Sequence, residues 1–129
     1  MPDYDPADAR ASYLFRVTVR LDPAPGYSAQ PDTFETVLSR AGDPPGEDGW
    51  LFFRDTLWRG ELGDAAHGRR LAADALGVPV ESVSFSELRT SQAYLDDLKA
   101  AIAADLALFN ADDVSEVLKK YLGSSIHVR

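Results

Sequence analysis

The clearest hydrophobic pattern in the chain runs from Tyr13 to Leu21. Every second residue of this segment is apolar, and the residues between them are polar from Arg16 onward. A period of two is that of a β-strand with one buried face. The segment 22–26, Asp-Pro-Ala-Pro-Gly, then predicts the end of the strand, because proline cannot donate to a sheet and glycine favours turns.

Two further strands are predicted before the first helix. The second fits Thr33 to Arg40, and a loop rich in glycine and proline follows at 41–49. A third strand begins at Trp50 and continues as far as Trp58. Three successive strands joined by loops indicate an antiparallel meander.

Helical patterns begin at Gly63-Asp64, where Asp64 is a suitable N-cap. Apolar residues at helical spacing extend this helix to about Leu76, and Gly77 is expected to end it. After the break at Val78-Pro79, the segment Glu81 to Phe85 has the composition of a fourth strand.

The last third of the chain predicts two more helices and a short strand. Ser91 is expected to cap a long helix that ends at Asn110. Asn110 or Asp112 caps the last helix, which stops at Gly123. Residues 125–129 form a short terminal strand.

The order strand-strand-strand-helix-strand-helix-helix-strand predicts an α+β fold, with a mainly antiparallel sheet of four to five strands and helices packed on one face. The third and fourth strands would flank the first helix in a strand-helix-strand unit. At 129 residues the chain suits one domain. We expect a flexible acidic lead-in at 1–10 and a single globular domain at 11–129.

The charge balance suggests a salty environment. The net charge is −8, with fifteen Asp to six Glu and ten Arg to three Lys. Self-repulsion among these carboxylates destabilises a fold in dilute buffer, whereas molar salt shortens the Debye length to ~3 Å and screens it. We expect adaptation to a salt-filled cytoplasm; the alternative is an acidic protein without such adaptation. Nonspecific binding to DNA is disfavoured, because DNA is a polyanion and would repel the acidic surface.

Trp50 to Glu61 is the segment richest in residues that dominate binding sites. It contains both tryptophans, together with Arg54 and Arg59. A guanidinium binds carboxylate or phosphate and stacks on aromatic rings. The alternative is structural: the aromatic residues fill the core, while Arg54–Asp55 and Arg59–Glu61 form local ion pairs.

Several arginines would gather on one sheet face if the strand registers align. The candidate binding residues are Arg16, Arg20, Arg40, Arg54, Trp58 and Arg59. Such a patch suits an anionic ligand, a phosphorylated metabolite or an RNA backbone. Cross-strand ion pairs with Glu35, Asp55 and Glu61 are the alternative.

No catalytic, cofactor or metal motif is present. The chain has no cysteine, no glycine-rich phosphate loop and no nucleophile elbow. The spacing of His67 and His127 matches no zinc motif. The N-terminus lacks the features of a signal peptide and no segment is apolar enough for a membrane span, so we expect a cytoplasmic protein.

Leu57-Trp58-Arg59 is a distinctive tripeptide. With the flanking segment 49–56 and the closing Lys120-Tyr121-Leu122-Gly123-Ser124-Ser125-Ile126, it resembles the haloarchaeal LWR-salt family, small acidic proteins named for this tripeptide and their halophilic hosts. The resemblance covers about Tyr13 to Val128. It implies adaptation to salt, and it supplies neither an activity nor site residues.

The sequence therefore favours a non-catalytic binding or interaction module that uses the Trp/Arg-rich region, with a protein or an anionic small molecule as its partner. One alternative is a small enzyme in which arginines hold an anionic metabolite and His67, His127 or a buried carboxylate acts as acid–base group. The other is an RNA-binding module with exposed aromatic rings beside arginines on a sheet face.

Overall fold

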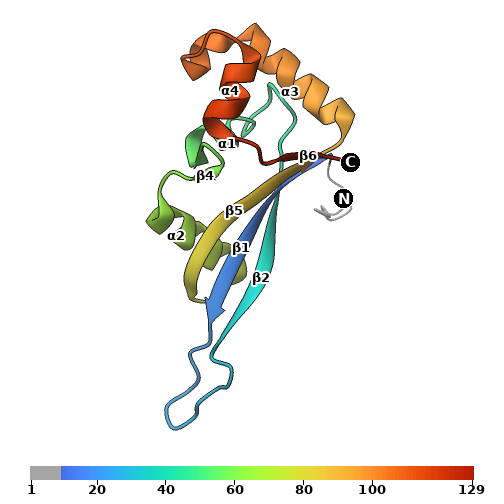
Figure 1. Ribbon diagram of the computed structural model, residues 1–129. Coiled ribbons are helices and arrows are strands. Elements are labelled where there is room, and N and C mark those ends of the chain that lie inside the picture. The colour runs from blue at the N-terminus through green and yellow to red at the C-terminus, as the bar shows by residue number, and fades with distance from the viewer. Residues whose placement is uncertain (1–9) are drawn as a thin grey trace.

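A four-stranded sheet in the order β2-β1-β5-β6 forms the base of the fold (Figure 1). The computed structural model describes residues 10–129. Strand β1 (Ala11–Arg20) lies between β2 (Thr33–Ala41) and β5 (Val80–Thr90) and is antiparallel to both. The short β6 (Ile126–Val128) runs parallel to β5 at the other edge. The predicted α+β class is confirmed, and the sheet is mixed, with two antiparallel pairings and one parallel.

The alternation along β1 places its apolar side chains on the inner face, as predicted. Tyr13, Phe15, Val17 and Val19 are buried, whereas Arg16 and Arg20 are exposed on the other face. The apolar residues opposite them on the neighbouring strands include Leu38 on β2 and Val83, Phe85 and Leu88 on β5. This face is the main hydrophobic core, because burial of such side chains is the dominant favourable term in folding.

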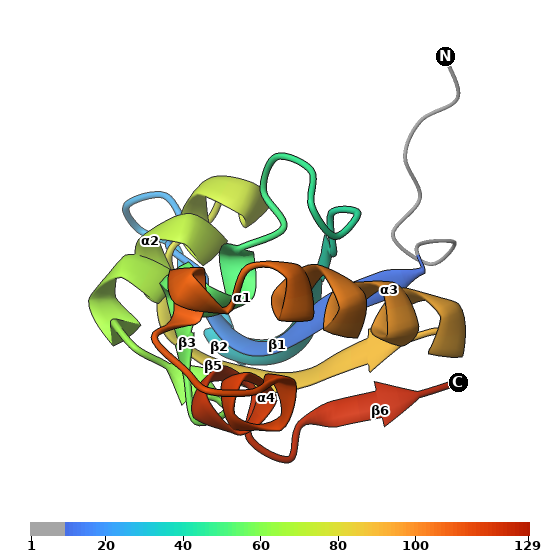
Figure 2. The ribbon, with the colours of Figure 1, turned by 90° about the horizontal axis from the view of Figure 1, so that it is seen from above.

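The helices pack mainly against this inner face (Figure 2). They are α2 (Ala65–Leu76), α3 (Gln92–Ala104) and α4 (Val114–Tyr121), with the 3₁₀ helix η2 (Leu106–Phe109) between the last two. None of the helices within residues 10–129 is both long and apolar enough to cross a lipid bilayer.

The predicted caps of α2 and α3 are confirmed. Asp64 and Ser91 each accept a hydrogen bond from a backbone N–H in the first turn, and Gly77 ends α2 in the left-handed conformation. For α4 the cap is Asp113 instead of Asn110 or Asp112. Asn110 instead ends η2, where it adopts the left-handed conformation.

The predicted third strand, Trp50 to Trp58, is wrong. Residues Phe52–Thr56 form a short helix, α1, and only β3 (Leu57–Trp58) is extended. β3 pairs with β4 (Glu61–Leu62) in a separate two-stranded hairpin. The run of four consecutive apolar residues at 50–53 has no period of two, and one helical turn buries Phe53 completely while Phe52 packs against Tyr13.

The strand-helix-strand unit expected around the first helix is also absent, because what remains of its first strand, β3, belongs to the separate hairpin and does not pair with β5. The parallel pair is instead β5 with β6, and α3, η2 and α4 form the connection between them. A crossover of this length is what parallel neighbours require.

An aromatic cluster joins α1 to the C-terminal helices. The Phe53 ring stacks on Phe109 at 5.7 Å between centroids and meets the edge of Tyr121 at 6.0 Å. Trp50 contacts both phenylalanines. Offset and edge-to-face ring pairs at these distances stabilise a core beyond their buried area. These rings belong to the same hydrophobic core as the inner face of the sheet and extend it toward α4.

We expect Phe53→Ala to lower the free energy of unfolding by about 3–5 kcal/mol, because it empties a fully buried site between three rings. Phe34→Ala is the matched control, since Phe34 is 46 % exposed on the edge strand β2 and should cost about 1 kcal/mol or less. Urea denaturation at fixed molar KCl measures both. Equal losses for the two variants would contradict the placement of α1 in the core.

Candidate functional site

The tripeptide Leu57-Trp58-Arg59 begins a tight hairpin. Leu57 pairs with Leu62 and Trp58 with Glu61, so only Arg59 and Gly60 remain in the loop. Both have positive φ, 52° and 81°. A two-residue loop with two positive φ angles is a type I′ turn, which matches the twist of the flanking strands.

The turn is hydrogen-bonded to the end of α4. The Arg59 N–H donates to the Lys120 carbonyl at 2.8 Å, and the Gly60 N–H donates to the Tyr121 carbonyl at 2.9 Å. Carbonyls in the last turn of a helix have no intrahelical partner. The hairpin therefore supplies the donors that the C-terminus of α4 lacks.

Two glycines allow this close approach. A Cβ on Gly60 would lie 3.0 Å from the Leu122 carbonyl oxygen, and one on Gly123 would lie 3.1 Å from the Arg59 carbonyl oxygen. Gly123 also has a positive φ of 61°. The two segments that carry the family resemblance, around the tripeptide and around Gly123, thus pack backbone against backbone.

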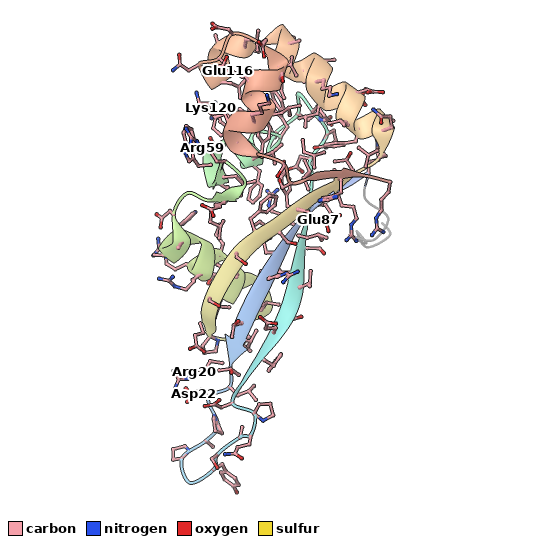
Figure 3. All side chains as sticks on the ribbon, in the orientation of Figure 1. Arg20, Asp22, Arg59, Glu87, Glu116 and Lys120 are labelled. Atoms are coloured by element: carbon pink, nitrogen blue, oxygen red, sulfur yellow. The ribbon has the colours of Figure 1, made fainter. Side chains whose placement is uncertain are left out.

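The side chains of the hairpin border an open groove of about 710 Å³ beside α4. Arg59, Lys120 and Glu116 lie on the same side of the molecule (Figure 3). The complete lining is Trp58, Arg59, Asp113, Ser115, Glu116, Lys119 and Lys120. Two of the three lysines of the chain are in this set.

Trp58 is the exposed aromatic surface of the groove. It is 47 % exposed, and its ring meets the edge of Tyr121 at 6.0 Å. The Arg59 guanidinium lies 5.7 Å from the indole centroid and the Lys120 ammonium 5.9 Å from it. These are cation–π distances, so the ring holds two positive charges next to an open apolar face.

The two carboxylates of the groove are engaged by the backbone of α4. Asp113 accepts a hydrogen bond from the Glu116 N–H at 2.8 Å, and Glu116 accepts one from the Asp112 N–H at 2.7 Å. By contrast, Arg59 forms no ion pair with any residue from 10 to 129. The lining holds three basic and two acidic side chains, a small excess of positive charge in a chain of net charge −8.

The expectation that the arginines share one sheet face is wrong. Arg16 and Arg20 lie on the outer face of β1, whereas Arg40 pairs with Tyr13 on the inner face. Arg54 belongs to α1 and Arg59 to the hairpin turn, so neither is on the sheet. Strand register, which the sequence did not specify, separates them.

Two of these arginines have an acidic neighbour, Arg54 at short distance and Arg40 at long distance. Arg54 pairs with Asp55 at 2.8 Å and also donates to the Leu108 carbonyl. Arg40 lies 3.8 Å from Asp43 and stacks over the Phe52 ring at 4.0 Å. The local pair Arg54–Asp55 is as expected, whereas the alternative pair of Arg59 with Glu61 is not formed. Of the six candidates, only Trp58 and Arg59 come together.

The sequence analysis missed Lys119 and Lys120. Basic residues in the last turn of a helix complement its dipole, and that role alone accounts for their positions in the sequence. Lys120 in addition donates to the Phe109 carbonyl at 2.9 Å. Their proximity to Trp58 depends on the long-range docking of the hairpin, which no local pattern reveals.

The outer sheet face lacks the aromatic residues that RNA-binding sheets use. Across from Arg16 stand Val37 and Ser84, and across from Thr18 stand Glu35 and Ser82. Within the part of the chain that the structure describes, the strand positions paired on this face include no Phe, Tyr or Trp. At these paired positions the ring available to a base is the His127 imidazole, without a larger aromatic side chain beside Arg16 or Arg20.

Both histidines are exposed and neither lines the groove. The Asp64 carboxylate caps α2 by accepting a hydrogen bond from the backbone N–H of His67, and this hydrogen bond lowers the pKa of the Asp64 carboxyl. His127 lies on β6. Between residues 10 and 129, no three His, Asp or Glu side chains come close enough together to hold a metal ion.

Comparison with known proteins returns one family. Residues 9–129 match the family model described as LWR-salt protein. A search of curated proteins found no match. A search of solved structures found none either.

We expect Gly123→Ala to destabilise the fold more than Gly77→Ala. Both glycines have positive φ, but a Cβ at Gly77 meets nothing within 4 Å, whereas one at Gly123 meets the Arg59 backbone. Gly77→Ala should cost about 1 kcal/mol for the backbone conformation alone, and Gly123→Ala about 2–3 kcal/mol. Urea denaturation compares them. Equal costs would mean that the hairpin does not dock on α4 as described.

Proposed function

The chain belongs to the LWR-salt protein family, and we propose that it is a non-catalytic binding protein whose contact site is the groove between the β3–β4 hairpin and α4. The partner we propose is an acidic segment of another protein. Trp58 supplies the apolar contact, and Arg59 with the two lysines of α4 receives the carboxylates.

The conformation of Arg59 is the observation that carries this proposal. The first position of a type I′ turn favours Asn, Asp or Gly, because other side chains are strained at positive φ. Arg59 occupies it at φ 52°, without a carboxylate partner among residues 10–129. Asn or Gly would relieve this backbone strain, so the presence of Arg59 points to a function of its side chain.

The chemistry of the groove suits a carboxylate-bearing peptide. A guanidinium binds carboxylate through two parallel hydrogen bonds. Trp and Arg are the residues most enriched where binding energy is concentrated. An open groove lined by seven residues suits an extended segment better than an enclosed small ligand.

Binding is favoured over catalysis because the groove contains no histidine and its two carboxylates serve as hydrogen-bond acceptors at the start of α4. Asp113 and Glu116 already accept backbone hydrogen bonds, and His67 and His127 lie elsewhere on the surface. A general acid or base must reach the reacting atom with a proton to exchange. The positive groups here supply recognition instead.

We also propose that the protein works in a salt-rich cytoplasm. No Asp or Glu from residue 10 to residue 129 is buried, and four ion pairs involve Asp97, Asp43, Asp55 and Glu87. The other carboxylates have no basic partner within 4.0 Å among the described residues. Unpaired surface charges of one sign repel unless salt screens them.

Arg59→Asn and Trp58→Ala test the binding site. Asn adopts a positive φ with less strain than Arg. We therefore expect the Arg59→Asn variant to melt at the same or a higher temperature than the wild type and to lose binding of the partner. Trp58→Ala should lose it too. Each variant is immobilised, and the proteins that it recovers from a native lysate at molar KCl are identified. The affinity of the purified partner is then measured for each variant, and we expect it to be weaker than for the wild type by about tenfold or more.

Matched controls keep this test specific. Arg20→Asn removes an exposed arginine at the far end of the sheet, and Tyr27→Ala removes an aromatic side chain that is 77 % exposed in the β1–β2 loop. Both should retain the partner. Unchanged affinity in the folded Trp58→Ala and Arg59→Asn variants would refute the proposed site.

Salt dependence tests the proposed environment. We expect the melting temperature, followed by circular dichroism, to fall steeply as KCl is lowered below about 1 M, because repulsion among the carboxylates returns. A variant with Asp48→Asn, Asp74→Asn, Glu81→Gln and Asp105→Asn, all exposed, should fold at lower salt than the wild type. A melting temperature independent of salt in both proteins would contradict the proposal.

A further inference from the structure

A second cavity lies between the inner face of the sheet and α2. Its volume is about 280 Å³, and most of its lining is apolar. The walls include Phe15 on β1, Val83 on β5, Phe52 on α1, Leu62 on β4 and Leu71 with Ala75 on α2. Specific small-molecule sites share this character: concave, largely apolar, with a few placed polar groups.

Arg40 is the charged residue in the described lining of this cavity. Its guanidinium carbon lies 4.0 Å from the centroid of the Phe52 ring, and Phe52 also lines the cavity, so this cation–π contact holds the group beside the cavity wall. The contact to Asp43 is long, 3.8 Å between Nη2 and Oδ2, and one further donor reaches the Ala41 carbonyl at 3.3 Å. A guanidinium has five N–H donors, so donors remain for a ligand.

We propose that this cavity binds a small amphipathic carboxylate, with its hydrocarbon part among the apolar walls and its carboxylate on Arg40. One guanidinium matches one carboxylate in charge and in fork geometry. A phosphate dianion is disfavoured, because the lining offers it no second cation. The site is separate from the hairpin groove and shares no lining residue with it.

Octanoate and 1-octanol, titrated into the full-length protein at molar KCl, separate the two parts of the proposed site. Backbone amide shifts in NMR spectra report both affinity and location. We expect saturable shifts at Phe15, Gly68 and Ala72. Arg40→Gln should weaken octanoate about tenfold and change octanol by less than about twofold, because only the charged head group loses its hydrogen bonds.

Two more variants complete the experiment. Ala75→Phe places a ring at the rim from an exposed helix position, so it should weaken both probes about tenfold or more without unfolding the protein. Arg54→Gln is the matched control, since Arg54 is also ion-paired but lies outside the cavity lining, and it should change neither.

Three results would overturn the inference: no octanoate binding at millimolar concentration, shifts confined to the residues around Trp58, or an equal effect of Arg40→Gln on the two probes. The second result would place the probe in the hairpin groove, and none of the three contradicts the proposed function of that groove, whose partner is measured with Trp58 and Arg59 variants. Failure here and failure of the proposed function are therefore distinguishable.

Discussion

The docking of the β3–β4 turn on the C-terminal end of α4 joins the hairpin to the C-terminal helices. Two peptide N–H groups, of Arg59 and Gly60, satisfy the Lys120 and Tyr121 carbonyls of α4. Buried peptide groups that find no partner are costly, so this pairing fixes where the hairpin and the helix lie. Because the contact is made by the backbone, the side chains of Trp58 and Arg59 stay available at the surface.

The aromatic cluster follows from the same contact. Once α4 lies against the hairpin, Tyr121 brings its ring between Trp58 and Phe53. Phe109 stacks on Phe53 and also meets the Tyr121 ring at 6.3 Å, so the three rings contact one another. The continuous hydrophobic core thus has two parts with different origins. The part on the sheet comes from alternation along β1, and the aromatic part comes from a long-range backbone contact that gathers rings from α1, η2 and α4.

Elements with a strong local signal were predictable, and contacts between distant segments were not. The alternation along β1, the capping residues Asp64 and Ser91 and the stop at Gly77 act within a few residues, so the sequence reveals them. The prediction of a strand at 50–53 was wrong because four consecutive apolar residues fit a buried strand as well as a helix. The grouping of Arg40 with Arg16 and Arg20 was conditional on strand register, which pairing between distant segments sets and which places Arg40 on the other face. Arg59 was predicted as a candidate, but its lysine neighbours come from a helix far along the chain.

The order in which the chain is made has a consequence for how it folds. A ribosome produces the hairpin donors long before the helix that accepts them, and β5 long before the parallel β6 that covers its edge. Until then, the nascent chain holds Phe53 and Trp58 without their aromatic partners. Such non-local closure is slow and leaves apolar surface exposed. During this time the many aspartates keep the growing polypeptide soluble through their negative charge. The acidic residues therefore act during synthesis as well as on the folded surface.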